Sequence, residues 1–419
     1  MTTIWDALLI DARVASMADR QGFGLIDDGA IGIRDGRIAW LGARQALDAV
    51  PAALARQVYS WDGRLITPGL IDPHTHVVHA GSRWPEFVHR MDPDAGSRPA
   101  PAGSGLMRTV HETRASGADE LLAQSLVRAR ALLAEGVTTL ESKTGYGLDL
   151  ENECKMARVS RALGQSLPLT VVSTFLGAHA LAPEFAGRPD DYLVFLCEDV
   201  LPVLVKDGLI DAVDIFCDAR GFSHAHLRQL HQASSACKLE LFVHADQYSA
   251  FGAGQLAAAL GARAAAHLEH ADARTARTMA QAGTVAVLLP GVSWMHRMTA
   301  RPPVKHFRAH GVPMALATNC NPGSSPCTSP LTIMNMACHL FGLSAPEALA
   351  GFTRCAAQAL GMQESRGTVA PGKYADLAIW DVSHPAELVA QVGGMPCHAV
   401  FKQGRWVHLS HVPQTPPGC

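Results

Sequence analysis

The chain has 419 residues, with 35 Lys and Arg against 38 Asp and Glu, a formal net charge of -3, and 48% hydrophobic against 17% charged residues. This composition excludes a mostly disordered chain, and the near-neutral charge argues against a nucleic-acid or anionic-membrane partner. No basic segment precedes an apolar stretch at the start, and no run of about 18 apolar residues occurs, so neither a secretion signal nor a membrane span is expected. Ten cysteines without a CxxC pair favour reduced thiols, and hence a cytoplasmic protein.

Short strands separated by turns are predicted at both ends of the chain. Apolar residues alternate on either side of residues 34–37, which form a hairpin signal. Turns are also expected at residues 371–372 and 403–404. Because the first segment is too short for a core of its own, we expect residues 1–65 and 366–419 to form one composite β-sandwich domain. Two unrelated additions to the core domain are the alternative.

Between these ends, residues 66–365 contain eight short apolar runs, each followed by a stretch with helical spacing. Parallel strands need crossover helices, and continuous apolar runs are typical of strands buried on both faces. The pattern therefore predicts an α/β fold, a (β/α)8 TIM barrel, with a doubly wound open sheet as its rival. The runs cover residues 65–76, 136–147, 169–180, 209–221, 238–247, 264–270, 284–292 and 313–323.

Polar residues collect at the C-terminal ends of these runs. In a barrel, all of these ends meet at one mouth, where active sites are built. Residues 90–105, rich in Pro, Gly, Ala and Asp, are the expected mobile loop over that mouth. The polar residues are His74, His76, Lys143, Tyr146, His179, His244, His267 and Asn319.

Histidines are abundant, with 20 in the chain, and two of them flank Thr75 in the first run. Side chains alternate along extended backbone, so His74 and His76 face the same side and can bind one metal ion. His244 and His267 end later runs and complete a nitrogen-rich set that suits zinc or ferrous iron. Taken singly, each of these residues has an ordinary alternative as a turn residue or a satisfied buried histidine.

Longer motifs resemble one family over nearly the whole chain. The similarity is to the imidazolonepropionases of histidine degradation, within the amidohydrolase superfamily. It implies a metal-dependent hydrolase that opens the ring of 4-imidazolone-5-propanoate at a C–N bond and yields N-formimidoyl-L-glutamate. The motifs are PGLIDPHTH (68–76), GSRWPEF (81–87), TGYGLDLENECKM (144–156), TFLGAHAL (174–181), VHADQ (243–247), TVAVLLPG (284–291), NPGSSP (321–326) and MNMACHLF (334–341).

The resemblance implies a role for individual residues. His74, His76, His244 and Asn319 would bind one divalent metal ion, Zn2+ or Fe2+. His267, Asn319 and Gln247 would form the catalytic set, with His267 holding water or polarising the ring carbonyl. The implied partner is a small substrate with a carboxylate, and because family members commonly dimerise, a homodimer is compatible with the resemblance. The residues implied to bind that substrate are Arg83, Tyr146, His179, Gln247, Asn321, Gly323 and Ser324.

The chain departs from the family pattern at Asn319, where the family has an aspartate that binds metal and moves a proton. An amide oxygen can bind a metal but accepts no proton, and losing that base is expected to cost roughly 10²-fold to 10⁴-fold in rate. One explanation is an engineered Asp to Asn change. A second is a natural relative in which Asp246 or His267 moves the proton, on this ring or on a hydantoin or thio-substituted analogue. The third is a non-catalytic paralogue that only binds its ligand.

Overall fold

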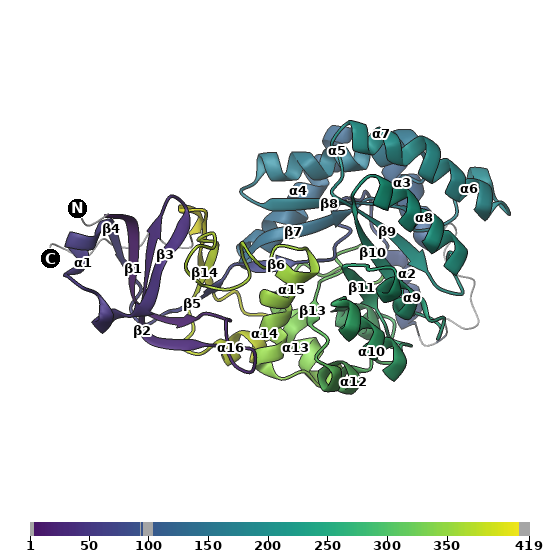
Figure 1. The fold of residues 1–419 in the computed structure, drawn as a ribbon. Coiled ribbons are helices and arrows are strands. Elements are labelled where there is room, and N and C mark those ends of the chain that lie inside the picture. Colours follow the sequence, from purple (N-terminus) through teal and green to yellow (C-terminus); the bar gives the residue numbers. More distant parts are fainter. Residues whose placement is uncertain (1–3, 93, 95–103, 410–419) are drawn as a thin grey trace.

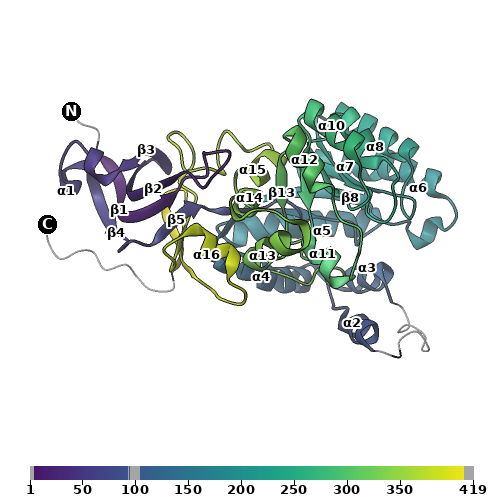
Figure 2. The same cartoon turned by 90° about the horizontal axis from the view of Figure 1, so that it is seen from below.

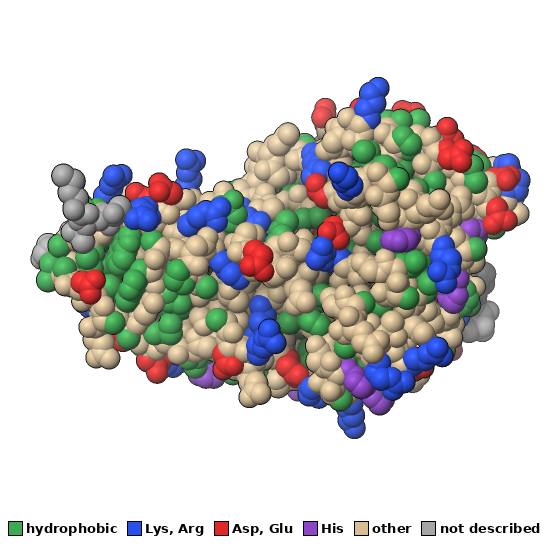
Figure 3. All heavy atoms as spheres, viewed as in Figure 1, with side chains coloured by type: hydrophobic (Ala, Val, Ile, Leu, Met, Phe, Trp, Pro, Cys, Tyr) green, Lys and Arg blue, Asp and Glu red, His purple; other side chains and the backbone are tan. Residues whose placement is uncertain are grey.

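The computed structural model describes residues 4–92, 94 and 104–409, which form two lobes, each built on one sheet (Figure 1). In Figure 1 the smaller lobe combines N-terminal strands in purple with C-terminal strands in yellow, and the larger lobe holds the middle of the chain. Basic and acidic side chains are scattered over both lobes on the face seen in Figure 3, in keeping with the near-neutral net charge. None of the helices within the described residues is long and apolar enough to cross a bilayer.

Eight parallel strands form the sheet of the larger lobe and follow one another in chain order. Their side chains are almost all buried, as expected when helices cover the outer face of the sheet and the inner face packs on itself in the barrel interior. The predicted TIM-like barrel is confirmed, since an open doubly wound sheet would reverse its strand order. The strands are β6 (Leu70–Asp72), β7 (Val137–Lys143), β8 (Thr170–Ala178), β9 (Ala212–Cys217), β10 (Glu240–Ala245), β11 (Ala264–His267), β12 (Val285–Leu288) and β13 (Met314–Leu316).

Backbone hydrogen bonds just beyond β6 and β13 bring the first and last strands together. Asn319 N donates to the His74 carbonyl at 3.0 Å, and His76 N donates to the Cys320 carbonyl at 3.0 Å. Residues 74–76 and 319–320 lie outside regular strands, yet they continue the wall and nearly close the barrel.

A ring of helices surrounds the barrel (Figures 1 and 2). Side-chain caps fix where several of them begin: Asp149 and Asp272 each accept a backbone N–H three residues on, and Ser223 forms a reciprocal capping box with His226. The main helices are α4 (Ala118–Ala134), α5 (Leu150–Ser166), α8 (His224–Ala236), α9 (Ala253–Ala259), α10 (Ala273–Ala282), α12 (Val304–His310), α13 (Pro330–Phe341), α14 (Ala345–Gly351) and α15 (Arg354–Ala359).

Shorter helical segments complete the larger lobe. Figure 2 shows α2 projecting from the barrel near α3. The expected mobile loop, residues 90–105, begins inside α2, and residues 93 and 95–103 lie outside the described part of the chain. The segments are α2 (Trp84–Met91), α3 (Leu106–Ala115), η3 (Pro183–Phe185), α6 (Pro189–Phe195), the π-helix η4 (Leu196–Val200), α7 (Leu201–Lys206), α11 (Pro290–Met295) and α16 (Pro385–Ala390).

The two chain ends pair into one mixed sheet in the order β16-β15-β14-β5-β1-β2-β3, with β4 beside β1. Asp35 and Gly36 have φ of 52° and 70°, the left-handed values that a tight hairpin between β2 and β3 requires. Side chains from the strands of both chain ends form one buried apolar cluster on this sheet. The elements are β1 (Trp5–Ala15), β2 (Leu25–Arg34), β3 (Arg37–Ala43), η1 (Arg44–Ala46), α1 (Pro51–Leu54), β4 (Ala55–Ser60), β5 (Leu65–Pro68), β14 (Leu377–Trp380), β15 (Cys397–Lys402) and β16 (Arg405–Leu409).

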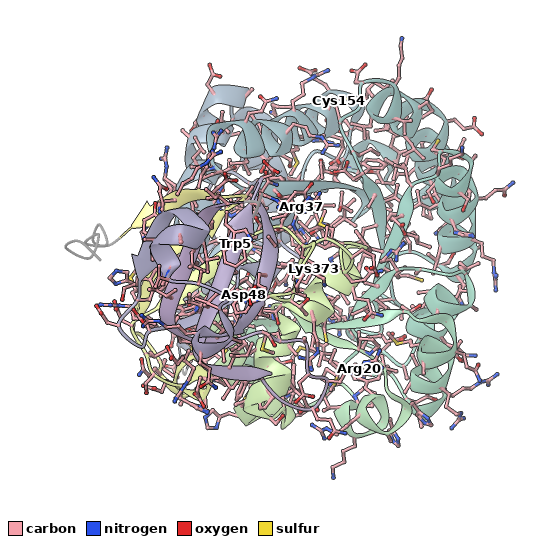
Figure 4. All side chains as sticks on the ribbon, turned by 60° about the vertical axis from the view of Figure 1, so that its left-hand side comes forward. Trp5, Arg20, Arg37, Asp48, Cys154 and Lys373 are labelled. Carbon is pink, nitrogen blue, oxygen red and sulfur yellow. The ribbon has the colours of Figure 1, made fainter. Side chains whose placement is uncertain are left out.

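Contacts between the two chain ends extend beyond the strand pairings. Ile38 N donates to the Lys373 carbonyl at 2.8 Å, and the Arg37 guanidinium lies 4.1 Å from the centre of the Tyr374 ring. Arg37 and Lys373, labelled in Figure 4, therefore mark where the N-terminal hairpin meets the C-terminal segment.

A buried ion cluster joins the smaller sheet to the barrel. Lys402 of β15 donates to the Thr138 carbonyl of β7 at 3.0 Å and to Asp376 at 3.3 Å. Arg366 donates to the same carboxylate at 3.1 Å. The side chains of Lys402, Asp376 and Arg366 are 9%, 2% and 8% exposed, so these charges are compensated mainly by one another.

Replacing Lys402 with methionine should destabilise the protein, because Asp376 then keeps only one of its two cations while buried. We expect the free energy of unfolding, from urea denaturation followed by circular dichroism, to fall by about 2–4 kcal/mol. The control is Lys305→Met on the exposed face of α12, which should change it by less than about 0.5 kcal/mol. Equal transitions for the two variants would contradict this role of Lys402.

Candidate active site

The C-terminal ends of the barrel strands open into a cavity of about 240 Å³. His244 and His267 belong to β10 and β11, His179 directly follows β8, and Asn319 lies three residues beyond β13. The barrel therefore brings most of the residues singled out from the sequence to one mouth. The cavity is lined by His76, Arg83, Leu106, Tyr146, His179, Phe216, His244, Gln247, Tyr248, His267, His296, Asn319, Asn321 and Ser324.

His74, Lys143 and Gly323, also singled out from the sequence, lie next to this lining rather than in it. His74 belongs to a buried histidine cluster that includes two lining residues. Lys143 is buried and pairs with Asp214, the carboxylate that contacts His244. Gly323 packs so closely against the Arg83 guanidinium that a Cβ atom there would overlap Nη1.

His74, His76 and His244 form the cluster, and each has a ring nitrogen within 4.8 Å of the others. Burial lowers the pKa of His244 to about 4 and holds the pKa values of His74 and His76 well below their usual range. All three rings are therefore neutral at pH 7, the form that binds metal. Within the described chain, Nε2 of His74 and Nε2 of His244 are buried without a hydrogen-bond partner. Orphaned neutral nitrogens facing one another fit a divalent ion such as zinc or ferrous iron.

The backbone that carries the first two histidines differs from the extended strand expected from the sequence. Strand β6 ends at Asp72, and residues 73–80 have no regular secondary structure. Hydrogen bonds from both neighbouring strand ends hold this segment in place, with Lys143 N donating to the Thr75 carbonyl at 3.0 Å on one side. The His74 and His76 rings still lie on the same side, with centroids 5.4 Å apart.

A buried chain of charges supports His244 from below. Its Nδ1 donates to Asp214 Oδ1 at 3.0 Å, and Lys143 Nζ lies 2.7 Å from Asp214 Oδ2 and 2.6 Å from Glu141 Oε1. Burial alone would raise the pKa of Asp214, but His244 and Lys143 together hold it well below its usual range. The ionised carboxylate fixes the tautomer of His244 with Nε2 free to bind a metal, as in carboxylate–histidine–metal arrangements.

Two residues beside the cluster have strained backbone. His267 and Asn319 have φ of 74° and 50°, and a left-handed conformation in a residue other than glycine costs roughly 1–3 kcal/mol and is concentrated at functional sites. The His267 ring lies 5.4 Å from that of His244, measured between centroids. Asn319 Oδ1 is buried and finds no hydrogen-bond partner among the described residues, so it is a further oxygen available to a metal.

Asp246 is unsuited to the proton-transfer role considered for it from the sequence. Its backbone turns into the left-handed region, with φ of 51°, and its two oxygens accept from Ala253 N and Gly254 N at 2.9 Å each. The carboxylate therefore binds the start of α9, and Asp246 does not line the cavity. Of the two alternatives named for proton transfer, only His267 faces the cavity.

Polar groups for a ligand occupy the wall next to His76. His179 stacks on His76 with centroids 5.1 Å apart, and its Nδ1 donates to the Gly145 carbonyl at 3.0 Å. Burial lowers the pKa of His179 to about 3, so its Nε2 is an acceptor at neutral pH. Burial also raises the pKa of Tyr146, which keeps its phenol protonated and able to donate.

The loop after β13 supplies further lining residues through a compact turn. Asn321 Oδ1 accepts hydrogen bonds from Gly323 N at 2.9 Å and from Ser324 N at 2.7 Å. This turn holds Asn321 and Ser324 at the cavity and places Gly323 against Arg83.

Sequence motifs alone did not indicate the carboxylates beneath the cluster or part of the cavity wall. Asp214 and Glu141 carried one available signal, since each is an acidic residue inside a run predicted to be a buried strand and must be paired when buried. Phe216, Tyr248 and His296 also line the cavity, but no spacing or motif distinguished them from core or loop residues.

Solved structures of other proteins match the fold of this chain over almost its whole length. A 5-methylcytosine deaminase from Klebsiella pneumoniae matches with a TM-score of 0.74 and 16% identity over 97% of this chain and 98% of its own. An adenosine deaminase from Xanthomonas campestris with bound zinc matches with a TM-score of 0.71 and 17% identity over 98% and 94%. At these identities the likeness establishes the fold.

Comparisons of sequence establish the family. The family model described as "Amidohydrolase family" matches residues 118–408. The imidazolonepropionase of Ralstonia nicotianae is 51% identical over 96% of this chain and 98% of its own length, and that of a Methylobacterium species is 49% identical over 96% and 99%. The chain therefore belongs to the imidazolonepropionase family of the amidohydrolases.

Replacing Asp214 with asparagine should weaken metal binding, because the charge that orients and polarises His244 is lost. We expect the dissociation constant for Zn2+, measured by competition with a chromophoric chelator, to rise roughly tenfold to a hundredfold. Asp211→Asn is the matched control, since Asp211 precedes the same strand but pairs with Arg161 near the surface. Unchanged zinc affinity in Asp214→Asn, with a normal thermal transition, would rule out this support for the cluster.

Proposed function

We propose that the chain hydrolyses the ring C–N bond of 4-imidazolone-5-propanoate to give N-formimidoyl-L-glutamate, a step of histidine degradation. The proposal rests on sequence identity. About half of the residues are identical to those of imidazolonepropionases over almost the full length of both chains. The cavity agrees with it in chemistry, since its lining includes both a cationic residue that suits a carboxylate and two members of a cluster that suits a metal.

The proposed metal ligands are His74, His76 and His244, with the amide oxygen of Asn319 as a fourth. Three neutral imidazoles and one oxygen accept zinc or ferrous iron equally well. When bound, such an ion supplies a water molecule of lowered pKa and polarises the ring carbonyl. Asp214 keeps His244 in the required tautomer, and the cluster's burial keeps competing protons off its nitrogens at neutral pH.

The proposed substrate contacts come from several segments around the cavity. Arg83 binds the propionate carboxylate, since a guanidinium can pair with both oxygens. The ring lies against Tyr146, His179 and Gln247, where His179 accepts and Tyr146 donates a hydrogen bond. The loop with Asn321, Gly323 and Ser324 holds the product end of the bound molecule.

The proton transfer is the step most affected by this chain's own residues. The ring nitrogen must gain a proton as the C–N bond opens, and an asparagine at position 319 offers no basic atom. His267 faces the cavity beside His244, so we assign it the proton that Asn319 cannot carry. Turnover is then slower than an aspartate at this position would allow.

Asn319 also favours a second candidate, a protein that binds a carboxylated five-membered ring without hydrolysing it. All the proposed ligand contacts are retained in that case, while the residue that the family uses for proton transfer is replaced. Hydrolysis of a hydantoin or a thio-substituted ring with the same side chain is a further variant of the enzymatic proposal. Turnover of the different rings separates these candidates.

Replacing Asn319 with aspartate should raise the turnover of 4-imidazolone-5-propanoate by the zinc-loaded protein. We expect kcat to rise roughly 10²-fold to 10⁴-fold, the usual contribution of a positioned general base. The assay follows the decay of substrate absorbance, corrected for spontaneous hydrolysis. Asn319→Asp in a His244→Ala background should not raise kcat, because His244→Ala removes a proposed metal ligand.

The two proteins together give three interpretable results. Turnover by both would show that another group, with His267 as our assignment, moves the proton in the parent chain. Turnover by Asn319→Asp alone would make the parent a binding protein with an otherwise intact site. Failure of both on this ring would refute the proposed substrate and direct the assay to hydantoins and thio-analogues.

A further inference from the structure

Arg83 is held on the cavity wall by a second residue, Glu86. Arg83 Nε donates to Glu86 Oε1 and Oε2 at 2.9 and 3.0 Å, and Nη2 donates to Oε2 at 2.6 Å. The two side chains are only 16% and 12% exposed. A forked ion pair that is this well shielded from solvent fixes the orientation of a guanidinium. An exposed pair of flexible side chains constrains that orientation poorly.

The ion pair occupies one edge of the guanidinium and leaves the other available. Nε and Nη2 form the edge that faces Glu86, whereas the N–H groups of Nη1 and the second N–H of Nη2 form the outer edge. That outer edge can grip a second carboxylate with another pair of parallel hydrogen bonds. Gly323 packs against the same group, so Arg83 is confined between Glu86 and the loop after β13.

Glu86 is itself fixed by the backbone. Gly105 N donates to Glu86 Oε1 at 2.9 Å, and the next residue, Leu106, begins α3 and lines the cavity. Burial would raise the pKa of Glu86, but its contacts with Arg83 and Gly105 hold that pKa below its usual range. The carboxylate therefore stays ionised at neutral pH and links the start of α3 to Arg83.

We propose that Glu86 is a positioning residue that turns the outer edge of Arg83 toward the cavity and thereby selects ligands with a carboxylate. The inference rests on the proposed function, in which Arg83 binds the propionate of the substrate. A competing role has the opposite sign: if Glu86 only neutralised Arg83, removing its charge would strengthen the binding of an anion. Geometry and charge can therefore be separated by experiment.

The test compares two ligands that share a ring and differ in charge, imidazole-4-propanoate and imidazole-4-propanamide. Their binding to the intact, zinc-loaded chain is measured by isothermal titration calorimetry. Two variants separate the effects: Glu86→Asp keeps the charge but shortens the side chain, and Glu86→Gln keeps the length but removes the charge. We expect both to weaken binding of the acid by about tenfold and to change binding of the amide by less than about twofold.

Asp191→Asn is the matched control. Arg188 and Asp191 form the same i,i+3 pair at the start of α6, at 3.2 Å, but their side chains are 55% and 61% exposed and lie outside the cavity lining. This variant should leave both affinities unchanged. Thermal transitions of all three variants show whether a loss of binding reflects loss of folding, in which case the amide would be lost together with the acid.

Each result has a defined meaning. Tighter acid binding in Glu86→Gln, with no change in Glu86→Asp, would overturn the positioning role in favour of neutralisation. Unchanged acid binding in both variants would overturn it while leaving the role of Arg83 intact. If the parent chain does not distinguish the acid from the amide, Arg83 does not bind the carboxylate, and that part of the proposed function fails as well.

Discussion

Two backbone hydrogen bonds beyond the first and last barrel strands determine where the chemistry of this protein can take place. Asn319 N donates to the His74 carbonyl and His76 N to the Cys320 carbonyl, each at 3.0 Å. The same bonds nearly close the barrel and place His74, His76 and Asn319 around one point. Residues 245 positions apart in the chain thereby reach the cluster completed by His244. Neither peptide segment is a regular strand, so their register depends on these bonds and on the neighbouring strand ends.

The second constraint is the cost of burying charge beneath this point. Asp214, Lys143 and Glu141 are at most 1% exposed, and each has an oppositely charged neighbour within 2.7 Å. Removing Lys143 would leave two buried carboxylates without their shared cation in the barrel interior, which is strongly destabilising. The site therefore consists of a buried layer of paired charges and a neighbouring cluster of neutral imidazoles. His244 connects the two through its hydrogen bond to Asp214. Because the paired charges form a layer of their own, the imidazole nitrogens of the cluster can remain unprotonated, although the ionised Asp214 carboxylate lies next to His244.

The sequence predicted the barrel because strand and helix periodicities differ and because parallel strands collect polar residues at one end. It could not predict the irregular backbone of residues 73–80, which depends on hydrogen bonds with segments far along the chain. Asp246 illustrates a different limit: it lies two residues after His244 in the sequence, but a left-handed turn directs its carboxylate to α9. The partner of Arg83 was equally hidden, because Glu86 lies three residues away at the start of a helix and nothing in the spacing says whether either side chain faces a cavity. The residue roles implied by resemblance remain predictions, although the fold brings those residues together.

The metal ion proposed for the histidine cluster can be located directly by X-ray diffraction. Crystals of the zinc-loaded protein would be measured on either side of the zinc absorption edge. The expected result is a single strong anomalous peak among His74, His76 and His244, with Asn319 as the nearest oxygen ligand. A peak elsewhere, or an empty cluster in protein that retains stoichiometric zinc, would contradict it.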